Sequence, residues 1–145
     1  MRVKVKKINE DAVLPKYATD FAAGADLYNL PGCDMTILPH STVIVHTGIS
    51  LEIPDGYVGL IFARSGMATK RGIAPANKVG VIDSDYRGEI MVALHNHTEN
   101  SVEVNGGERI AQLCIVPYVF AEFEETDEIS ETVRGQKGFG SSGTK

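Results

Sequence analysis

The sequence predicts an all-β fold: a jelly-roll-like β-barrel or sandwich with one short helix and a flexible C-terminal tail. Short apolar runs recur along the chain, and turns that contain glycine or proline separate them. The alternation of strands with long helical segments that marks a parallel sheet does not occur. We therefore expect antiparallel strands that enclose a single core.

The length and composition fit one folded domain. We expect the β domain to span residues 1–133 of the 145 and a mobile lid to follow over residues 134–145. The net charge of −5 argues against a broad nucleic-acid surface, so no nucleic-acid partner is expected. Apolar runs are too short to span a membrane and the N-terminus lacks an apolar signal core, which predicts a cytoplasmic protein with no membrane partner.

The first half of the chain consists mainly of expected strands. Alternating or continuous apolar residues predict them, and a Pro-Asp-Gly turn at residues 54–56 separates the last two. The strands are expected over residues 2–8, 26–30, 35–38, 42–49, 51–53 and 58–63.

The predicted helix covers Gly66 to Arg71, with Ser65 as its N-cap and Gly72 at its C-terminal cap position. Arg64, Ser65 and Gly66 would bring a guanidinium, a hydroxyl and free backbone N–H groups to its start, which is typical of an anion site. Ordinary helix capping explains the same residues equally well.

Residues 77–94 are predicted to form one β-hairpin that carries its candidate functional side chains at the tip. A strand pattern over residues 79–82 ends in the polar cluster Asp-Ser-Asp-Tyr-Arg-Gly at residues 83–88, and a second apolar run begins at Ile90. Two carboxylates, a phenol and a guanidinium within five positions are more than a turn needs. The alternative is a solvated turn in which Asp83 and Asp85 serve as Asx-turn residues.

Two strand features have both a structural and a functional interpretation. His95 and His97 have the spacing to face one side of a strand and ligate a metal, but no third ligand is apparent nearby, so exposed strand residues are expected. Gln112 lies in an apolar strand, where it either satisfies backbone groups or points into a site.

The C-terminal tail follows an acidic connector. Residues 138–143 match the pattern GxGxxG, but no helix can follow it, which excludes a dinucleotide site. The residues fit a disordered tail. Alternatively, Phe139 among glycines and serines, with Arg134 nearby, suits a lid that closes over a ring and a phosphate.

Five separated motifs together resemble those of the trimeric dUTP pyrophosphatase (dUTPase) family. They occur in the family's order and cover nearly the whole chain. The motifs are AGADL at residues 23–27, ARSG at 63–66, GVIDSDYRGE at 80–89, GERIAQL at 107–113 and RGQKGFGSS at 134–142.

The resemblance implies a homotrimer whose three active sites are each assembled from all three subunits. It also implies hydrolysis of dUTP to dUMP and pyrophosphate with Mg²⁺, which clears dUTP and supplies dUMP for thymidylate synthesis. Asp83 would be the general base that activates the attacking water. Tyr86 would pack against the deoxyribose and exclude UTP, while Asn77 and the backbone around Val81 would hydrogen-bond the uracil edge.

The resemblance assigns further residues to the phosphates, the metal and the lid. In the body of the protein, the phosphate chain would be held by Arg64, Ser65, Gly66 and Gln112. The tail would close over the γ-phosphate and the uracil with Arg134, Phe139, Gly140, Ser141 and Ser142. Asp26 would lie close to the water shell of Mg²⁺. Phosphoanhydride cleavage needs a base, a metal and cationic clamps, and the chain offers a candidate for each.

Two other functions are alternatives on the same fold. One is an enzyme related to dCTP deaminase, against which the tail motif at residues 134–142 argues. The other is a non-catalytic nucleotide-sensing module, which would not need to keep both Asp83 and Tyr86.

Overall fold

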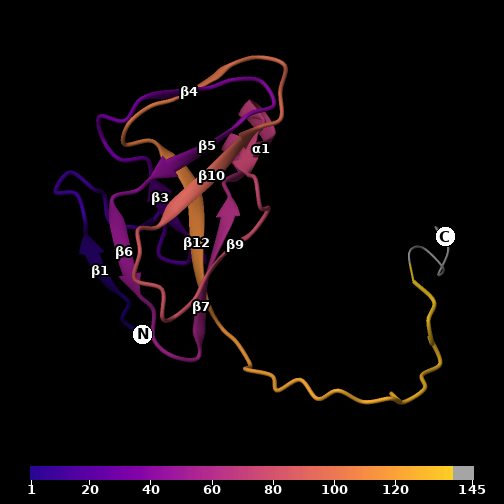
Figure 1. The fold of residues 1–145 in the computed structure, drawn as a ribbon. Helices are drawn as coiled ribbons and strands as arrows, with labels where there is room; N and C mark the ends of the chain where they lie inside the picture. Colours follow the sequence, from indigo (N-terminus) through magenta and orange to yellow (C-terminus); the bar gives the residue numbers. More distant parts are fainter. Residues whose placement is uncertain (139–145) are drawn as a thin grey trace.

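The computed structural model describes residues 1–138, and these form a β protein with one short helix (Figure 1). The helix α1 covers Ser65–Arg71. The strands are β1 (Lys4–Lys7), β2 (Lys16–Tyr17), β3 (Ala25–Tyr28), β4 (Met35–Ile37), β5 (Thr42–His46), β6 (Ile49–Glu52), β7 (Tyr57–Ala63), β8 (Ile73–Pro75), β9 (Gly80–Ile82), β10 (Met91–Asn96), β11 (Val102–Val104) and β12 (Arg109–Pro117). The prediction of an all-β fold is confirmed.

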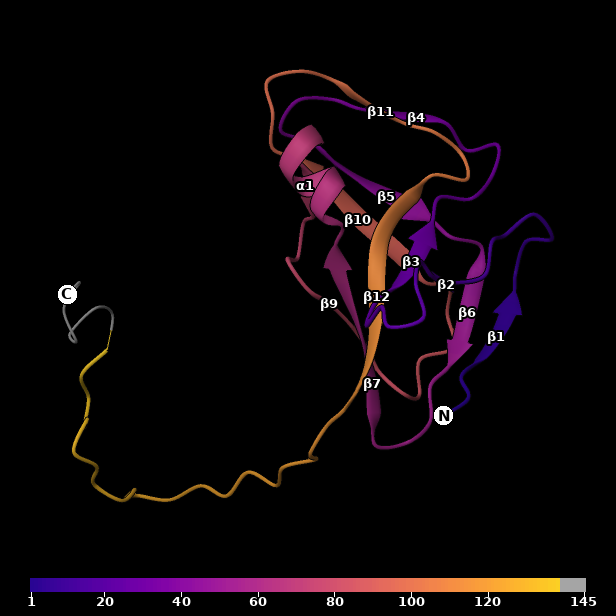
Figure 2. The same ribbon diagram turned by 180° about the vertical axis from the view of Figure 1, so that it is seen from behind.

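Two sheets form the main layers of the molecule. One has the strand order β2-β3-β12-β7-β9 and the other β5-β10-β8, while β1 pairs with β6 and β4 with β11. All of these pairings are antiparallel. In Figure 1, β5 and β10 cross in front of β3 and β12, and in Figure 2 they lie behind them. The arrangement is a jelly-roll-like sandwich.

The core lies between these two layers because the strands alternate in burial. On β10, Val92, Leu94 and Asn96 are buried, and the residues between them face outward. The five-stranded sheet contributes Leu27 and Ile61 to the same apolar cluster. Burial of each large aliphatic side chain stabilises the fold by about 1.5–3 kcal/mol.

The strand expected over residues 42–49 is interrupted. β5 ends at His46 and β6 begins at Ile49, with a sharp corner at Thr47 and Gly48 between them. Gly48 has a φ of 70°, a left-handed conformation that a non-glycine residue rarely adopts. The apolar pattern continues through the corner, which is why the sequence alone did not reveal it.

The helix begins one residue earlier than predicted. Arg64 occupies the N-cap position with extended backbone and makes no side-chain cap, so the assignment of Ser65 as N-cap is wrong. Ser65 is instead the first helical residue, and its carbonyl accepts a hydrogen bond from Thr69 Oγ1 at 2.7 Å. Gly72 ends the helix in the left-handed conformation, as predicted.

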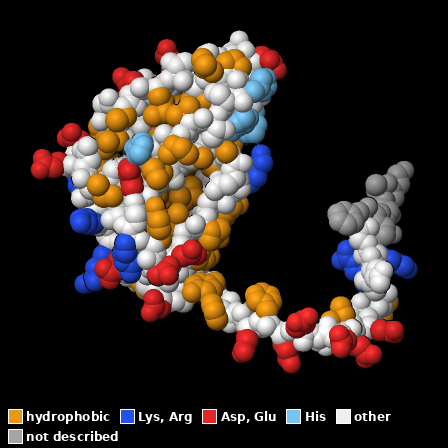
Figure 3. Space-filling model, in the orientation of Figure 1, with side chains coloured by type: hydrophobic (Ala, Val, Ile, Leu, Met, Phe, Trp, Pro, Cys, Tyr) orange, Lys and Arg blue, Asp and Glu red, His pale blue; other side chains and the backbone are white. Residues whose placement is uncertain are grey.

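After β12 the chain leaves the body of the molecule as an extended segment, residues 118–138, which we call the C-terminal arm (Figures 1 and 3). Acidic residues alternate along it with apolar side chains that are almost fully exposed, among them Val119 at 90%, Phe120 at 88% and Phe123 at 96%. Within residues 1–138, no helix is long and apolar enough to cross a membrane.

Candidate functional site

Residues 83–90 connect two different sheets and are not the tip of a hairpin. β9 pairs with β7, whereas β10 pairs with β5 and β8, so the two strands that flank this segment do not pair with each other. The hairpin predicted over residues 77–94 is therefore wrong. Each flanking strand pairs with partners elsewhere in the sequence, and the polar cluster lies in a crossover between layers.

This 83–90 loop has a defined internal structure. The backbone N–H of Tyr86 donates to the Asp83 carbonyl at 3.2 Å, and the Tyr86 hydroxyl donates to the Glu89 carbonyl at 3.0 Å. A Cβ atom on Gly88 would lie 2.3 Å from the Tyr86 hydroxyl oxygen, so this close approach requires glycine. The loop thus holds Tyr86 folded against Gly88 and leaves Asp83 exposed.

Asp83 lies between two hollows of the surface. The smaller, of about 160 Å³, brings Asp83 and Tyr86 together with Val81, Ile82, Glu89 and Met91. The larger, of about 560 Å³, is lined by Val58, Leu60, Val81, Asp83, Ser84, Asp85, Tyr118 and Phe120. A carboxylate and a phenol therefore lie beside apolar walls, as in many small-molecule sites.

The segment before this loop offers free backbone groups. β9 is the outer strand of its sheet, so along residues 80–82 one edge has no strand partner within the described part of the chain. Such an edge presents N–H and C=O groups to a ligand. Asn77 lies in the preceding turn, where its carbonyl accepts the Val79 N–H at 2.8 Å. The structure thus places Asn77, Val81, Asp83 and Tyr86 along one continuous segment.

A second group of site residues surrounds the buried carboxylate of Asp26. Arg64 Nε donates to Asp26 Oδ1 at 2.8 Å, Arg109 Nη1 donates to Oδ2 at 3.3 Å, and Gln112 Nε2 lies 3.5 Å from Oδ1. The pairing of β3 with β12 sets Gln112 directly opposite Asp26. The Asp26 side chain is only 3% exposed. Two guanidinium groups balance its negative charge, so it is not an isolated buried anion.

The start of α1 lies next to this group. Arg64 immediately precedes the helix, and its Nη1 also donates to the Arg109 carbonyl at 3.4 Å. Ser65 and Gly66 are exposed, and no heavy atom lies within 4 Å of the position that a Gly66 Cβ would occupy. The structure therefore brings together five predicted residues: Asp26, Arg64, Ser65, Gly66 and Gln112.

Arg109 was not among the residues that the sequence singled out. Its guanidinium is half-exposed and shares the Asp26 carboxylate with Arg64. A buried aspartate needs nearby positive charge to balance its own charge. That requirement could have identified Arg109, which lies at the start of the strand that carries Gln112.

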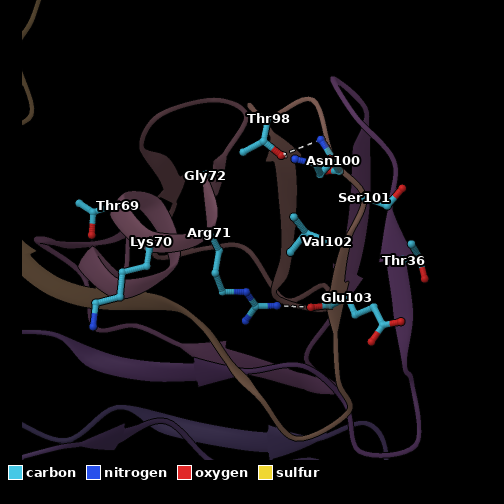
Figure 4. A pocket seen from close by; sticks show the side chains of 10 residues that line it. All are labelled: Thr36, Thr69, Lys70, Arg71, Gly72, Thr98, Asn100, Ser101, Val102 and Glu103. Carbon is cyan, nitrogen blue, oxygen red and sulfur yellow. Dashed lines mark hydrogen bonds between the residues drawn. The ribbon is translucent and has the colours of Figure 1, made fainter.

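Arg71 holds the other end of α1 to β11 and to the residue that precedes β12. Its Nη1 donates to Glu108 Oε1 and, at 3.2 Å, to Met67 Sδ, and its Nη2 donates to the Glu103 carbonyl. Figure 4 shows the contact between Arg71 and Glu103 at a surface hollow of about 750 Å³ that also contains Lys70, Thr98 and other residues. The Arg71 guanidinium is thus committed to protein groups, and it fixes the helix that begins with Ser65.

The two groups of site residues are far apart within one chain. Ile82 pairs with Gly59 on β7, and Arg64 follows β7. Asp83 follows Ile82, so six residue steps separate it from Arg64 when they are counted along β7. At about 3.3 Å per residue of an extended strand, the two residues are roughly 20 Å apart. Within one chain, Asp83 and Arg64 therefore lie at well-separated places along the sheet.

Of the predicted tail residues, the structure describes only Arg134. Arg134 lies in the C-terminal arm, where its Nε donates to the Lys137 carbonyl at 2.9 Å. The predicted lid residues Phe139, Gly140, Ser141 and Ser142 lie outside the described residues.

His95 lies on β10 and His97 directly follows it, and the described residues offer them no third metal ligand. The rings of His95 and His97 are 4.5 Å apart, centroid to centroid, and His95 Nδ1 lies 2.9 Å from Thr42 Oγ1. Desolvation, and then the charge of His95, lower the pKa of His97. Within residues 1–138, no cluster of three or more histidine, cysteine or acidic side chains could hold a metal ion.

Comparisons with known proteins agree with the motifs. The dUTPase family model matches residues 10–143. Deoxyuridine 5'-triphosphate nucleotidohydrolase of Nautilia profundicola is 48% identical over 143 residues, which cover 99% of each chain. The protein of that name in Hydrogenobaculum sp. is 48% identical over 145 residues, 100% of each chain.

A solved structure shares the fold. The Staphylococcus bacteriophage 80alpha dUTPase, in its structure with dUPNHPP, has a TM-score of 0.89 and 29% identity, and the match covers 98% of both chains. The family model and the two bacterial relatives each extend over nearly the whole chain. The chain therefore belongs to the dUTPase family.

Proposed function

We propose that this protein hydrolyses dUTP to dUMP and pyrophosphate. The names of its bacterial relatives and the dUTP analogue in the phage enzyme support this reaction. The observation that carries the proposal is the 83–90 loop beside the open edge of β9. There the exposed Asp83 carboxylate and a positioned phenol lie beside a strand edge that has no strand partner within residues 1–138, and together these groups suit a nucleoside.

Asp83 acts as the general base. Its exposed carboxylate lines both hollows and can accept a proton from a water molecule that attacks the α-phosphorus. The bond from the α-phosphorus to the oxygen that bridges it to the β-phosphorus breaks, and pyrophosphate leaves. No covalent intermediate is needed, because the protein has only to orient the water and stabilise charge.

The open edge of β9 and Tyr86 select the nucleoside. The backbone around Val81, with Asn77, hydrogen-bonds the uracil edge as a neighbouring strand would. Tyr86, held against Gly88 by its hydroxyl contact with Glu89, packs on the deoxyribose where a 2′-hydroxyl would have to fit. These contacts favour dUTP over UTP.

The group around Asp26 holds the phosphate chain. The Asp26 carboxylate fixes the guanidinium of Arg64 before substrate arrives, so less conformational entropy is lost on binding. Ser65, Gly66 and Gln112 complete the contacts. Arg109, on the same carboxylate, adds positive charge beside them.

Mg²⁺ fits this site as an ion brought by the substrate. The described residues provide no cage of metal ligands, and both Asp26 oxygens already accept hydrogen bonds from arginine. Mg²⁺ commonly binds through substrate phosphates and retained waters, so Asp26 would contact its water shell. When bound, the ion would neutralise the negative charge of the triphosphate.

The active unit is a homotrimer whose sites are shared between subunits. Asp83 and Arg64 lie roughly 20 Å apart along one chain by strand geometry, so a complete site needs Asp83 from one copy and Arg64 from another. The C-terminal arm supports the same conclusion. Phe120 and Phe123 are 88% and 96% exposed, and such apolar side chains are expected to pack on a neighbouring subunit.

Residues 134–145, which begin within the C-terminal arm, close the site as a lid. Arg134, Ser141 and Ser142 contact the γ-phosphate, and Phe139 with Gly140 covers the uracil. This role is supported by the motif at residues 134–142 and by the C-terminal arm, which extends away from the body of its own chain (Figure 1).

The test is pyrophosphate release from dUTP, dTTP, dCTP and UTP, each with Mg²⁺ and with a chelator. Fast release from dUTP alone, abolished by the chelator, is the expected result. Ammonia release from dCTP would support the deaminase-related alternative. Binding of dUTP without turnover of any nucleotide would support a sensing module and overturn the proposed reaction.

A further inference from the structure

The 83–90 loop is attached at its far end to the corner between β5 and β6. Glu89 Oε1 accepts the Gly48 N–H at 2.8 Å, and Glu89 Oε2 lies 2.8 Å from His46 Nδ1. We call Glu89, His46 and Gly48 the Glu89 anchor. Both carboxylate oxygens are engaged, and the side chain is 21% exposed. Glu89 thus joins the loop to a corner that lies about forty residues earlier in the sequence.

The corner is a rigid attachment point. Gly48 has a φ of 70°, and a Cβ there would lie 2.8 Å from Leu30 Cδ1, so the direction of its N–H group is fixed by a conformation that excludes other residues. Next to the anchor, the Thr47 hydroxyl donates to the Ile90 carbonyl, and the Ile90 N–H donates to the Ile49 carbonyl at 2.8 Å. The loop therefore ends on a buried, fully hydrogen-bonded junction.

The same residue that reaches the corner also holds Tyr86. The backbone carbonyl of Glu89 accepts the Tyr86 hydroxyl, while its side chain binds His46 and Gly48. A shift of Glu89 would consequently move the phenol. Glu89 also lines the hollow that contains Asp83 and Tyr86, so such a shift would change the shape of the nucleoside site itself.

We propose that Glu89, supported by His46, is a positioning residue that sets the place of Tyr86 and thereby the discrimination between deoxyribose and ribose. The inference rests on the proposed function, because it concerns the nucleotide that this site accepts. Glu89 touches neither the scissile bond nor the attacking water. It acts through the hydroxyl contact of Tyr86 and through the path of the loop toward Asp83.

Two substitutions of Glu89 separate positioning from folding. Glu89→Ala removes both acceptors and frees the loop end. Glu89→Gln keeps an oxygen for the Gly48 N–H and offers an amide N–H to the other tautomer of His46, so it preserves the geometry of the anchor. The control is Glu99→Ala, because Glu99 also contacts a histidine, His40 Nε2 at 3.0 Å, but is 86% exposed and lies away from the 83–90 loop.

The experiment measures kcat and KM for dUTP and UTP, with the melting temperature of each variant. In Glu89→Ala, the ratio of kcat/KM for dUTP to kcat/KM for UTP should fall on the order of tenfold, because a small displacement of groups in the site changes the rate by a large factor. The kcat for dUTP should fall as well. Glu89→Gln should restore most of both, and Glu99→Ala should match the wild type.

An unchanged ratio in Glu89→Ala, or a ratio that Glu89→Gln fails to restore, would overturn the proposal. If Glu89→Ala does not fold, His46→Ala removes one of the two anchor contacts at a side chain that is 55% exposed, and a smaller change of the ratio in the same direction is expected. An unchanged ratio there would equally overturn it. Failure of the proposed function would appear separately, as absence of dUTP turnover in the wild type.

Discussion

Arg64 Nε donates to Asp26 Oδ1 at 2.8 Å, and the Asp26 side chain is 3% exposed. The contact ties β3 to the residue that precedes α1, so the interior of the sheet determines where the Arg64 guanidinium points. Arg109 occupies the other carboxylate oxygen at 3.3 Å. One buried charge thus orders two cations that would otherwise be free to move on the surface.

Asp26→Asn should destabilise the protein by about 3 kcal/mol, because it leaves two guanidinium groups beside a neutral amide at a buried position. Urea denaturation at one fixed protein concentration measures the effect. The control is Asp20→Asn, a change at an exposed aspartate nearby in sequence. Equal denaturation midpoints for Asp26→Asn and the wild type would show that the carboxylate does not stabilise this region.

Asp83→Asn should lower kcat for dUTP by about 10²–10⁴-fold, since the amide cannot accept a proton from the attacking water. The affinity for dUTP should remain measurable because the side chain keeps its shape. Pyrophosphate release and equilibrium binding are the two measurements. Asp85→Asn, at an exposed carboxylate in the same loop, should retain most activity. Turnover by Asp83→Asn close to that of the wild type would remove Asp83 from the role of base.

Gly88→Ala should relax the discrimination against UTP. The new Cβ would lie 2.3 Å from the Tyr86 hydroxyl oxygen, so the phenol must move from its place. We expect the preference for dUTP over UTP in kcat/KM to fall by about tenfold or more. Tyr86→Ala should show the same relaxation. A Gly88→Ala enzyme that still rejects UTP as the wild type does would mean that this position of Tyr86 does not govern sugar selection.

Arg71→Gln should lower the free energy of unfolding by about 1–2 kcal/mol, because Glu108 and the Glu103 carbonyl lose a charged donor. It should also raise KM for dUTP, since the helix that begins with Ser65 becomes less firmly held. Thermal unfolding and steady-state kinetics measure the two effects. Lys70→Gln, at the exposed neighbouring position, is the matched control and should change neither.

The all-β fold could be predicted because strand patterns and turn residues are local properties of the sequence. The continuous apolar run that predicts β10 and the glycine that ends α1 are both visible without a structure. The group around Asp26 was also foreseen in part, because its residues lie in recognisable motifs. Arg109 was not, since its role depends on sharing a carboxylate that is distant in sequence.

The hairpin error has a physical cause. The residues between β9 and β10 have the composition of a turn. The pairing of strands, however, depends on contacts that sequence patterns do not encode. Here β9 and β10 pair with strands in different layers. The link from Glu89 to His46 and Gly48 was hidden for the same reason. Ser65 was misplaced by one position, which is the usual uncertainty at a helix end.

The distance between Asp83 and Arg64 along β7 has a genetic consequence. A chain that has lost Asp83 still carries Arg64 and the group around Asp26, and a chain that has lost Arg64 still carries an intact 83–90 loop. In the proposed homotrimer with shared sites, two such inactive chains expressed together would form some mixed assemblies that contain a site with both halves unimpaired. Two defective alleles would then restore activity to each other, although neither supports it alone.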